Sequence, residues 1–194
     1  MSFRFVTQKL STGLYEPEGI YLQKPFEGEA RIGQGWNEHG QEYSEYRYNG
    51  IPLKGHNGID FVIEPHAHIL VVDEGRVVEV GWERGGFERY IKVEHRWGES
   101  FYAFLGDVLV DSGQRIARGA PIALSDSNSE KAPFFHFAIR VEPFNRLDGF
   151  GGFSDPTPFF NPADIQYDET NLEAEAPPKM YHAMSQEKTG MRRP

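Results

Sequence analysis

The chain has 194 residues, with 20 Lys and Arg against 29 Asp and Glu, which gives a formal net charge of −9. This length suits one domain with extensions and is enough for a single buried core. The acidic balance argues against unassisted nucleic-acid binding, and the absence of cysteine excludes disulfide and thiolate chemistry.

Residues 1–25 are interpreted as an N-terminal extension with two short strand-like pieces, Phe3–Val6 and Ile20–Leu22. The first residues lack the apolar core and small-residue cleavage site of a secretory signal, so we expect a protein made in the cytoplasm. No apolar run approaches the ~20 residues needed to span a membrane, so no transmembrane segment is expected.

Residues 35–49 are polar and rich in aromatic side chains, among them Trp36, Tyr43 and Tyr46. One interpretation is a surface loop that is packed by its own aromatic rings. The other is the wall of a substrate groove, where a tyrosine can stack and hydrogen-bond at once.

The segment that follows places His56 and Asp60 four residues apart, with Asn57-Gly58 between them. Imidazole nitrogen and carboxylate oxygen both bind zinc at roughly 2.0–2.2 Å. On a straight strand the two residues would lie about 13 Å apart, at roughly 3.3 Å per residue. A shared metal therefore requires a tight bend at Asn57-Gly58 that leads into a strand. The alternative is an Asn-Gly hairpin turn with an incidental histidine and aspartate.

Short hydrophobic segments separated by turns continue along the chain and indicate an all-β fold. The short connections favour hairpins and a meander of antiparallel strands. The strand candidates are Ile69–Val72, Arg76–Gly81, Tyr90–His95, Ser100–Leu105, Arg115–Ile116 and Pro121–Leu124.

A last strand is predicted over residues 132–141, where Phe135, Phe137 and Ile139 alternate onto one face. His136 then points to the opposite face. A lone histidine in an apolar strand is usually a satisfied core or edge residue. Here it would add a third ligand to the His56 and Asp60 pair, and three protein ligands with one open position are the catalytic zinc pattern.

These segments together resemble the lysostaphin/LytM-type zinc endopeptidases, which cut peptide cross-links of bacterial cell walls. The resemblance implies an antiparallel β-sheet domain of the duplicated hybrid motif type over residues 26–162, and zinc bound by His56, Asp60 and His136. It implies a substrate groove lined by Trp36, Tyr43, Tyr46 and Tyr102. The matching segments are Ile32–Trp36, Gly55–Phe61, Gly75–Val78, Tyr90–His95, Tyr102–Leu105, Gly113–Gly119 and Phe134–Phe137.

Two positions depart from the family pattern. The family has a histidine where this chain has Phe104, and another where it has Phe134. In the family these imidazoles orient the attacking water and stabilise the tetrahedral intermediate. A general acid or base contributes typically 10²–10⁴-fold and an oxyanion donor about 10²–10³-fold. We therefore expect no catalytic residue at these positions, and an apolar ring against the metal site.

Four other residues are candidates to replace the lost imidazoles. His66 and His68 stand where a solvated turn is expected, and His95 stands where the family commonly has a histidine outside the metal site. Asp107 follows Phe104 closely. We do not expect any of them to restore catalysis.

After the last strand, residues 143–161 are rich in Gly, Phe and Pro and resemble the closing segment of some family members. Residues 163–194 form an acidic, proline-containing tail that cannot bury much surface alone.

Three functions remain open. The first is a pseudoenzyme that keeps the fold and zinc and serves as a structural or peptidoglycan-binding component, as in a phage or tail-like particle. The second is an active zinc endopeptidase that cleaves peptidoglycan cross-links outside the cytoplasm. The third is a metal-free interaction module whose extensions grip neighbouring subunits of a larger assembly. The loss of both imidazoles favours the first.

Overall fold

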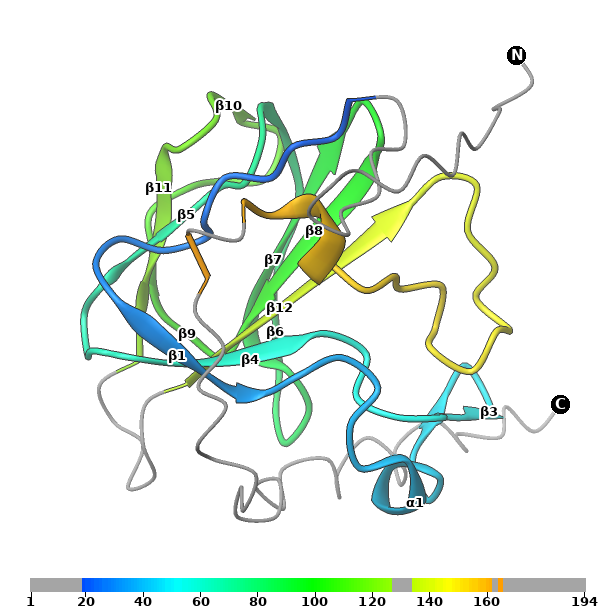
Figure 1. The fold of residues 1–194 in the computed structure, drawn as a ribbon. Helices are drawn as coiled ribbons and strands as arrows, with labels where there is room; N and C mark the ends of the chain where they lie inside the picture. Colours follow the sequence, from blue (N-terminus) through cyan, green and yellow to red (C-terminus); the bar gives the residue numbers. More distant parts are fainter. Residues whose placement is uncertain (1–18, 127–133, 162–163, 166–194) are drawn as a thin grey trace, which may run out of the picture.

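The computed structural model describes residues 19–126, 134–161 and 164–165. The predicted strand-like piece at Phe3–Val6 and the tail beyond Ile165 lie outside the described residues. Strands dominate the described part of the chain (Figure 1). They are β1 (Ala30–Gln34), β2 (Arg47–Tyr48), β3 (Ile51–Pro52), β4 (Ile59–Ile63), β5 (His68–Leu70), β6 (Gly75–Glu83), β7 (Glu88–His95), β8 (Gly98–Ala103), β9 (Leu105–Val108), β10 (Arg115–Ile116), β11 (Pro121–Ser125) and β12 (Phe134–Val141), with the short helices α1 (Gly40–Tyr43) and η1 (Thr157–Phe159).

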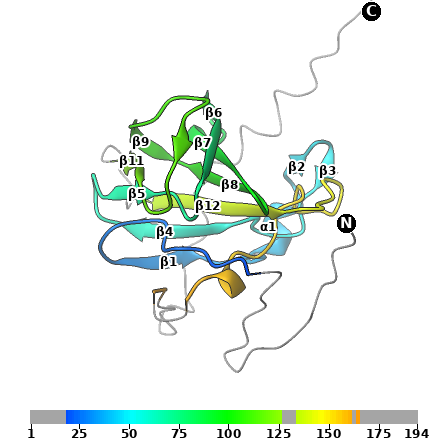
Figure 2. The same cartoon turned by 90° about the horizontal axis from the view of Figure 1, so that it is seen from above.

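Seven strands form the main sheet, in the order β1-β4-β12-β8-β7-β6-β10, and a smaller sheet has the order β5-β11-β9. All the strand pairs in these sheets are antiparallel. The small sheet lies at one end of the molecule, and α1 with the β2-β3 hairpin lies at the opposite end (Figures 1 and 2). The antiparallel all-β fold expected from the sequence is confirmed.

Alternation along β12 separates the two faces of the main sheet. Phe135, Phe137 and Ile139 enter the main hydrophobic core, as predicted. Ala138 belongs to a second cluster on the other face, against which Phe134 packs. Burying one such side chain contributes on the order of 1.5–3 kcal/mol, so a one-residue slip of β12 would be costly. His136 is therefore held on the second face by the packing of its neighbours.

The predicted strand Ser100–Leu105 is in fact two strands in different sheets. β8 ends at Ala103 in the main sheet, and β9 begins at Leu105 in the small sheet. Phe104 between them has a left-handed backbone, with φ at 57°. The hydrophobic pattern runs on through this point, but the left-handed residue turns the chain out of one sheet into the other.

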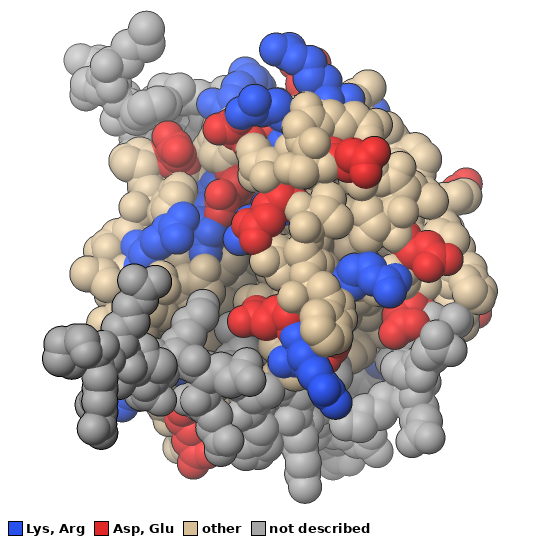
Figure 3. All heavy atoms as spheres, turned by 180° about the vertical axis from the view of Figure 1, so that it is seen from behind, with Lys and Arg blue, Asp and Glu red and all other residues tan. Residues whose placement is uncertain are grey.

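The described surface carries charges of both signs. On the face shown in Figure 3, acidic and basic side chains are interspersed, and neither sign covers a continuous area. Among the described residues, no helix has the length and apolar character that a membrane span requires.

Candidate metal centre

Cross-strand register places two of the predicted ligands beside each other. Asp60 on β4 is paired with His136 on β12, and on its other side Asp60 is paired with Gln34 on β1. Paired residues of neighbouring strands project from the same face of a sheet. The register therefore sets Gln34, Asp60 and His136 in one row across three strands.

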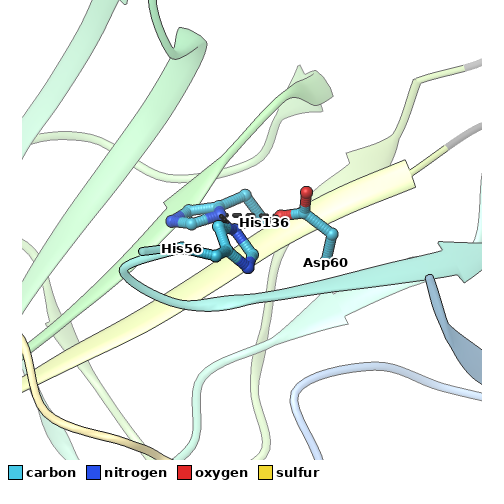
Figure 4. A group of neighbouring side chains, drawn as sticks. All are labelled: His56, Asp60 and His136. Carbon is cyan, nitrogen blue, oxygen red and sulfur yellow. Dashed lines mark hydrogen bonds and ion pairs between the residues drawn. The ribbon is translucent and has the colours of Figure 1, made fainter. Parts of the chain in front are cut away.

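His56 reaches this row through the bend predicted from the sequence. The chain bends at Asn57 and Gly58, and β4 begins at Ile59. The bend returns the His56 imidazole over β4, so that it faces Asp60 and His136 (Figure 4). The alternative of a simple hairpin turn is wrong for this segment. Asn57 and Gly58 precede β4, but they do not connect two strands that pair with each other.

Three potential ligand atoms form a small triangle. The distance from Asp60 Oδ1 is 2.7 Å to His136 Nδ1 and 3.2 Å to His56 Nε2. The two imidazole nitrogens are 3.2 Å apart. Ligands bound tetrahedrally to zinc at about 2.0–2.1 Å lie roughly 3.3 Å from one another. The two distances of 3.2 Å match this spacing, and the 2.7 Å distance is a hydrogen-bond length that would widen slightly around a shared zinc ion.

The tautomer of His56 follows from its second nitrogen. Its Nδ1–H donates to the carbonyl oxygen of Gly35 at 2.9 Å. In a neutral imidazole this leaves the lone pair on Nε2, which faces the other two ligands. A backbone carbonyl that orients a histidine in this way is the usual support of a metal ligand.

The protonation states also suit a cation. Burial raises the pKa of Asp60, but His56, when protonated, and the hydrogen bond from His136 outweigh it, so the net pKa is well below its ordinary value. Burial lowers the pKa of His136, against the opposing effect of Asp60. An ionised carboxylate and a neutral imidazole are the forms that bind metal.

Unpaired polar atoms gather at this site. Among the described residues, the buried side-chain atoms without a hydrogen-bond partner are Gln34 Nε2, Asn57 Oδ1 and His136 Nε2. Each belongs to the ligand row or to the bend beside His56. A buried orphan atom in a folded protein points to a water or ion that completes it. These orphan atoms are not the three triangle atoms, so they indicate water or another ligand around the cluster. The donor set of His56, Asp60 and His136 itself fits a zinc ion.

Gly58 is required by the close approach of His136. A Cβ atom at this position would lie 2.5 Å from His136 Cε1 and 2.6 Å from the Phe137 carbonyl oxygen. Contacts this short do not occur in real structures, and the carbonyl belongs to the backbone. The glycine of the predicted motif therefore serves packing around the ligand as well as the bend.

An aromatic cap covers the site on the second face of the main sheet. We use this name for Phe87, Phe104 and Phe134. The Phe104 and Phe134 rings are 4.7 Å apart. The His136 ring lies 5.7 Å from Phe87 and 6.4 Å from Phe104. His136 is fully buried and Asp60 is only 5% exposed. Apolar rings thus lie against the ligand triangle, as the sequence predicts.

A backbone hydrogen bond links two residues of the aromatic cap. The Phe104 N–H donates to the Phe87 carbonyl oxygen at 3.1 Å. A bulky residue with positive φ is uncommon, whereas histidine is one of the types enriched there. Phe104 therefore keeps a strained backbone at a position where the family pattern has an imidazole.

The other candidate residues lie away from the ligand triangle. His66 is exposed in a turn, as expected. His68 is instead the exposed first residue of β5, where it is paired with Glu27 at 2.8 Å. Asp107 is exposed, 3.7 Å from Arg89. His95 is buried, but it bonds to Ser100 and to a backbone carbonyl. In the described part of the chain, the only cluster that could hold a metal is His56, Asp60 and His136.

The predicted groove residues separate into two groups. Trp36 is half-buried and stacks on Phe150 at 4.7 Å, and Tyr46 is half-buried beside Tyr43. Tyr43 itself is fully buried, with its ring 5.6 Å from that of His56. Its hydroxyl cannot reach a substrate in this conformation, and the interpretation of this loop as packed by its own aromatic rings holds for Tyr43.

Tyr102 is a correction to the predicted groove. Its side chain is fully buried in the main core, where its hydroxyl accepts a hydrogen bond from the Val72 N–H at 3.0 Å. The reason is strand alternation, because Phe101 and Ala103 take the site-facing positions of β8. Tyr102 therefore faces the opposite side of the sheet from His136.

Sequence reasoning missed Phe87 as a site residue. It follows Arg84-Gly85-Gly86, a segment whose pattern predicts only a turn. The hairpin of β6 and β7 carries its ring onto the His136 ring, about fifty positions away in the sequence. No local pattern signals such a contact, because it depends on where the hairpin end lies in the folded sheet.

Comparison with known proteins finds a family that includes the segment with the ligand candidates. The model of peptidase family M23 matches residues 54–148, which include all three ligand candidates. An uncharacterized metalloprotease of Haemophilus influenzae is 25% identical over 71% of this chain and 29% of its own length. The glycyl-glycine endopeptidase ALE-1 of Staphylococcus capitis is 27% identical over 65% of this chain and 36% of its own length. The chain thus spans about a third of these relatives.

Solved structures support the same fold. The antimicrobial peptidase lysostaphin from Staphylococcus simulans superposes with a TM-score of 0.53 at 21% identity, covering 77% of this chain and 55% of that one. The described β domain is therefore an M23 peptidase domain. The chain belongs to the lysostaphin/LytM family, and its domain carries a His/Asp/His cluster.

Proposed function

We propose that this chain is a pseudoenzyme of the M23 family, a zinc-holding structural or peptidoglycan-binding component without turnover. The observation that carries the proposal is the aromatic cap. By the resemblance to the family, Phe104 and Phe134 stand where its catalytic imidazoles would be, and their rings pack on each other beside a buried ligand triangle. His56 and His136 are fully buried and Asp60 is 5% exposed, so binding of a peptide bond at the ligand atoms would require the site to open.

The residues of the site define what it can and cannot do. His56, Asp60 and His136 would hold the zinc, which supplies Lewis-acid polarisation when bound. Phe104 and Phe134 can neither move a proton nor donate a hydrogen bond. The Phe104 ring lies against His136 and the Phe134 ring packs on Phe104, so the surface at this side of His136 is apolar. Loss of a general acid or base lowers the rate by roughly 10²–10⁴-fold, and loss of an oxyanion donor lowers it by roughly 10²–10³-fold.

Peptidoglycan peptides are the partner that we propose, because the relatives include a glycyl-glycine endopeptidase. A phage or tail-like particle is the proposed setting, with neighbouring subunits of that particle as further partners. The domain limits that we propose are residues 1–25, 26–162 and 163–194, with the zinc site entirely in the second.

An active zinc endopeptidase is the second candidate. It is favoured by the ligand triangle itself, whose three donor atoms keep the spacing of a metal site. Activity would require the cap to open and a group other than Phe104 or Phe134 to handle the proton.

The experiment measures the release of soluble peptide from purified cell-wall preparations. We expect no release by the zinc-loaded wild-type protein above that of Asp60→Ala. The double variant Phe104→His with Phe134→His should gain release that a chelator abolishes. Release by the wild-type protein that is lost on chelation and in Asp60→Ala would overturn the proposal and establish the second candidate.

A further inference from the structure

We propose that Gln34 is a fourth polar residue of the metal site, whose side-chain amide serves an oxygen ligand at the open coordination position. The inference rests on the zinc site of the proposed function and adds to it a residue outside the three predicted ligands.

The position of Gln34 is set by the sheet. It is the last residue of β1 and is paired with Asp60, which is in turn paired with His136. The row of three polar side chains therefore begins with this amide. Gly35, the next residue, supplies the carbonyl oxygen that accepts the His56 Nδ1–H. The segment Gln34-Gly35 is thus joined to the ligand triangle at two of its residues, Asp60 and His56.

The amide is buried and only half satisfied. Gln34 is 5% exposed, and its Oε1 accepts a hydrogen bond from the Tyr43 hydroxyl at 3.2 Å. Its Nε2 has no partner. Buried side-chain amides with a free donor are rare, and each implies a water, an ion or a ligand that completes it. The residue that carries this donor is paired with Asp60 of the ligand triangle and does not belong to the main core.

Tyr43 connects the amide to a ligand. Its hydroxyl holds Gln34, while its ring lies 5.6 Å from the His56 ring at an interplanar angle of 36°. One side chain therefore positions both the amide and the imidazole. A tyrosine hydroxyl can donate or accept, so either end of the amide can be turned toward the site while the contact with Tyr43 is kept.

The chemistry of the open position matches this donor. Zinc with three protein ligands takes water or another oxygen ligand at the fourth position. Inside an aromatic-lined site such an oxygen needs hydrogen-bond donors from the protein. Within the ligand row, the Gln34 amide is a neutral donor that needs no protonation change. The ligand class is therefore a water molecule or a small oxyanion.

The test compares Gln34→Leu with the control Gln41→Leu, which changes an exposed glutamine of α1. Zinc affinity is measured by competition with a chromogenic chelator, and thermal unfolding is measured on the metal-free proteins. We expect Gln34→Leu to bind zinc about 10–100-fold more weakly, the range for residues that support metal ligands. The stability of its metal-free form should change little, because the removal of a buried orphan donor is offset by the loss of the acceptor of the Tyr43 hydroxyl. Tyr43→Phe should weaken zinc binding in the same direction but less.

The cobalt(II) form gives a second readout, because its visible spectrum reports the oxygen ligand at the open position. Gln34→Leu should alter this spectrum and Gln41→Leu should leave it unchanged. Equal zinc affinity and equal cobalt spectra in Gln34→Leu and wild type would overturn the inference while the zinc site of the proposed function stands. A wild-type protein that binds no zinc would overturn both. A loss of metal-free stability without a change in zinc affinity would make Gln34 a structural residue only.

Discussion

Two buried histidine clusters in this domain contrast with each other. At the metal centre, His56, Asp60 and His136 converge, and buried polar atoms remain unpaired. Around His95, the imidazole Nδ1–H donates to the Glu74 carbonyl at 2.9 Å, and Nε2 bonds to Ser100 Oγ at 2.6 Å.

The His95 cluster is completed by further contacts. The Ser100 hydroxyl bonds to the Tyr102 hydroxyl at 3.0 Å, and the Val72 N–H also bonds to this hydroxyl. The Trp97 ring stacks on His95 at 4.6 Å. Every hydrogen-bonding atom named here has a protein partner. A complete set of partners marks a structural network, whereas converging ligand atoms with unpaired polar atoms around them mark a candidate ligand site.

The largest expected effect is on zinc binding at the metal centre. Asp60→Ala removes the oxygen that lies nearest both imidazoles, at 2.7 and 3.2 Å. Zinc affinity should fall by more than about 100-fold, the upper range for a supporting residue, because a direct ligand is lost. Elemental mass spectrometry should find about one zinc per wild-type chain and none in the variant. Retention of stoichiometric zinc by Asp60→Ala would mean that the metal is bound elsewhere.

Gly58→Ala tests the packing around His136. The added methyl group would press on the His136 ring and the Phe137 carbonyl. Overpacking at backbone should cost about 3 kcal/mol in the free energy of unfolding, the upper end of the usual range. The variant should also lose zinc affinity, since His136 must move. Chemical denaturation with and without zinc measures both effects, and unchanged stability of the metal-free form would contradict the close approach of His136 to Gly58.

Tyr102→Phe tests the other cluster. The change leaves the Val72 N–H buried without its acceptor, and Ser100 loses a partner. A buried group left unpaired costs about 1–3 kcal/mol. Urea denaturation should show this loss while the zinc affinity stays the same. A change in zinc affinity would show that the two clusters are coupled through β8.

The smallest effect is a dependence on pH. Burial lowers the pKa of His95. The hydrogen bond to the Glu74 carbonyl and the charge of Asp73 raise it, but by less. The folded state then binds a proton less readily than the unfolded state, whose histidine has a pKa near 6.5. The stability of the metal-free protein should therefore fall as the pH drops below about 6.5, by at most about 1.4 kcal/mol per pH unit for each proton.

The variant His95→Asn isolates this contribution. It should flatten the decline in stability between pH 7 and pH 5, and the remaining slope comes from other groups, including His136, whose pKa is also lowered. Denaturation curves at several pH values in the absence of metal give the comparison. An identical slope in the variant would show that His95 does not titrate in this range.

Much of the fold and the ligand set could be predicted from the sequence. Alternation in β12 correctly placed Phe135 and Phe137 in the core and His136 on the other face. The bend at Asn57 and Gly58 was required by the spacing of His56 and Asp60, and β4 begins directly after it. These features depend on the local alternation of residues and on the conformational freedom of glycine, and both can be read from neighbouring positions in the sequence.

Tertiary structure alone decided which side chains surround the ligands. Phe87 reaches His136 because the β6-β7 hairpin end lies over the sheet, and Gln34 meets Asp60 through the register of β1 on β4. Tyr102 lies on the face opposite the predicted one because the register of β8 on β12 pairs it with Phe137, whereas Ala103 is paired with His136. Contacts of this kind join residues that are distant in the chain. They arise from the packing and register of whole strands, and the residue pattern near each position does not contain them.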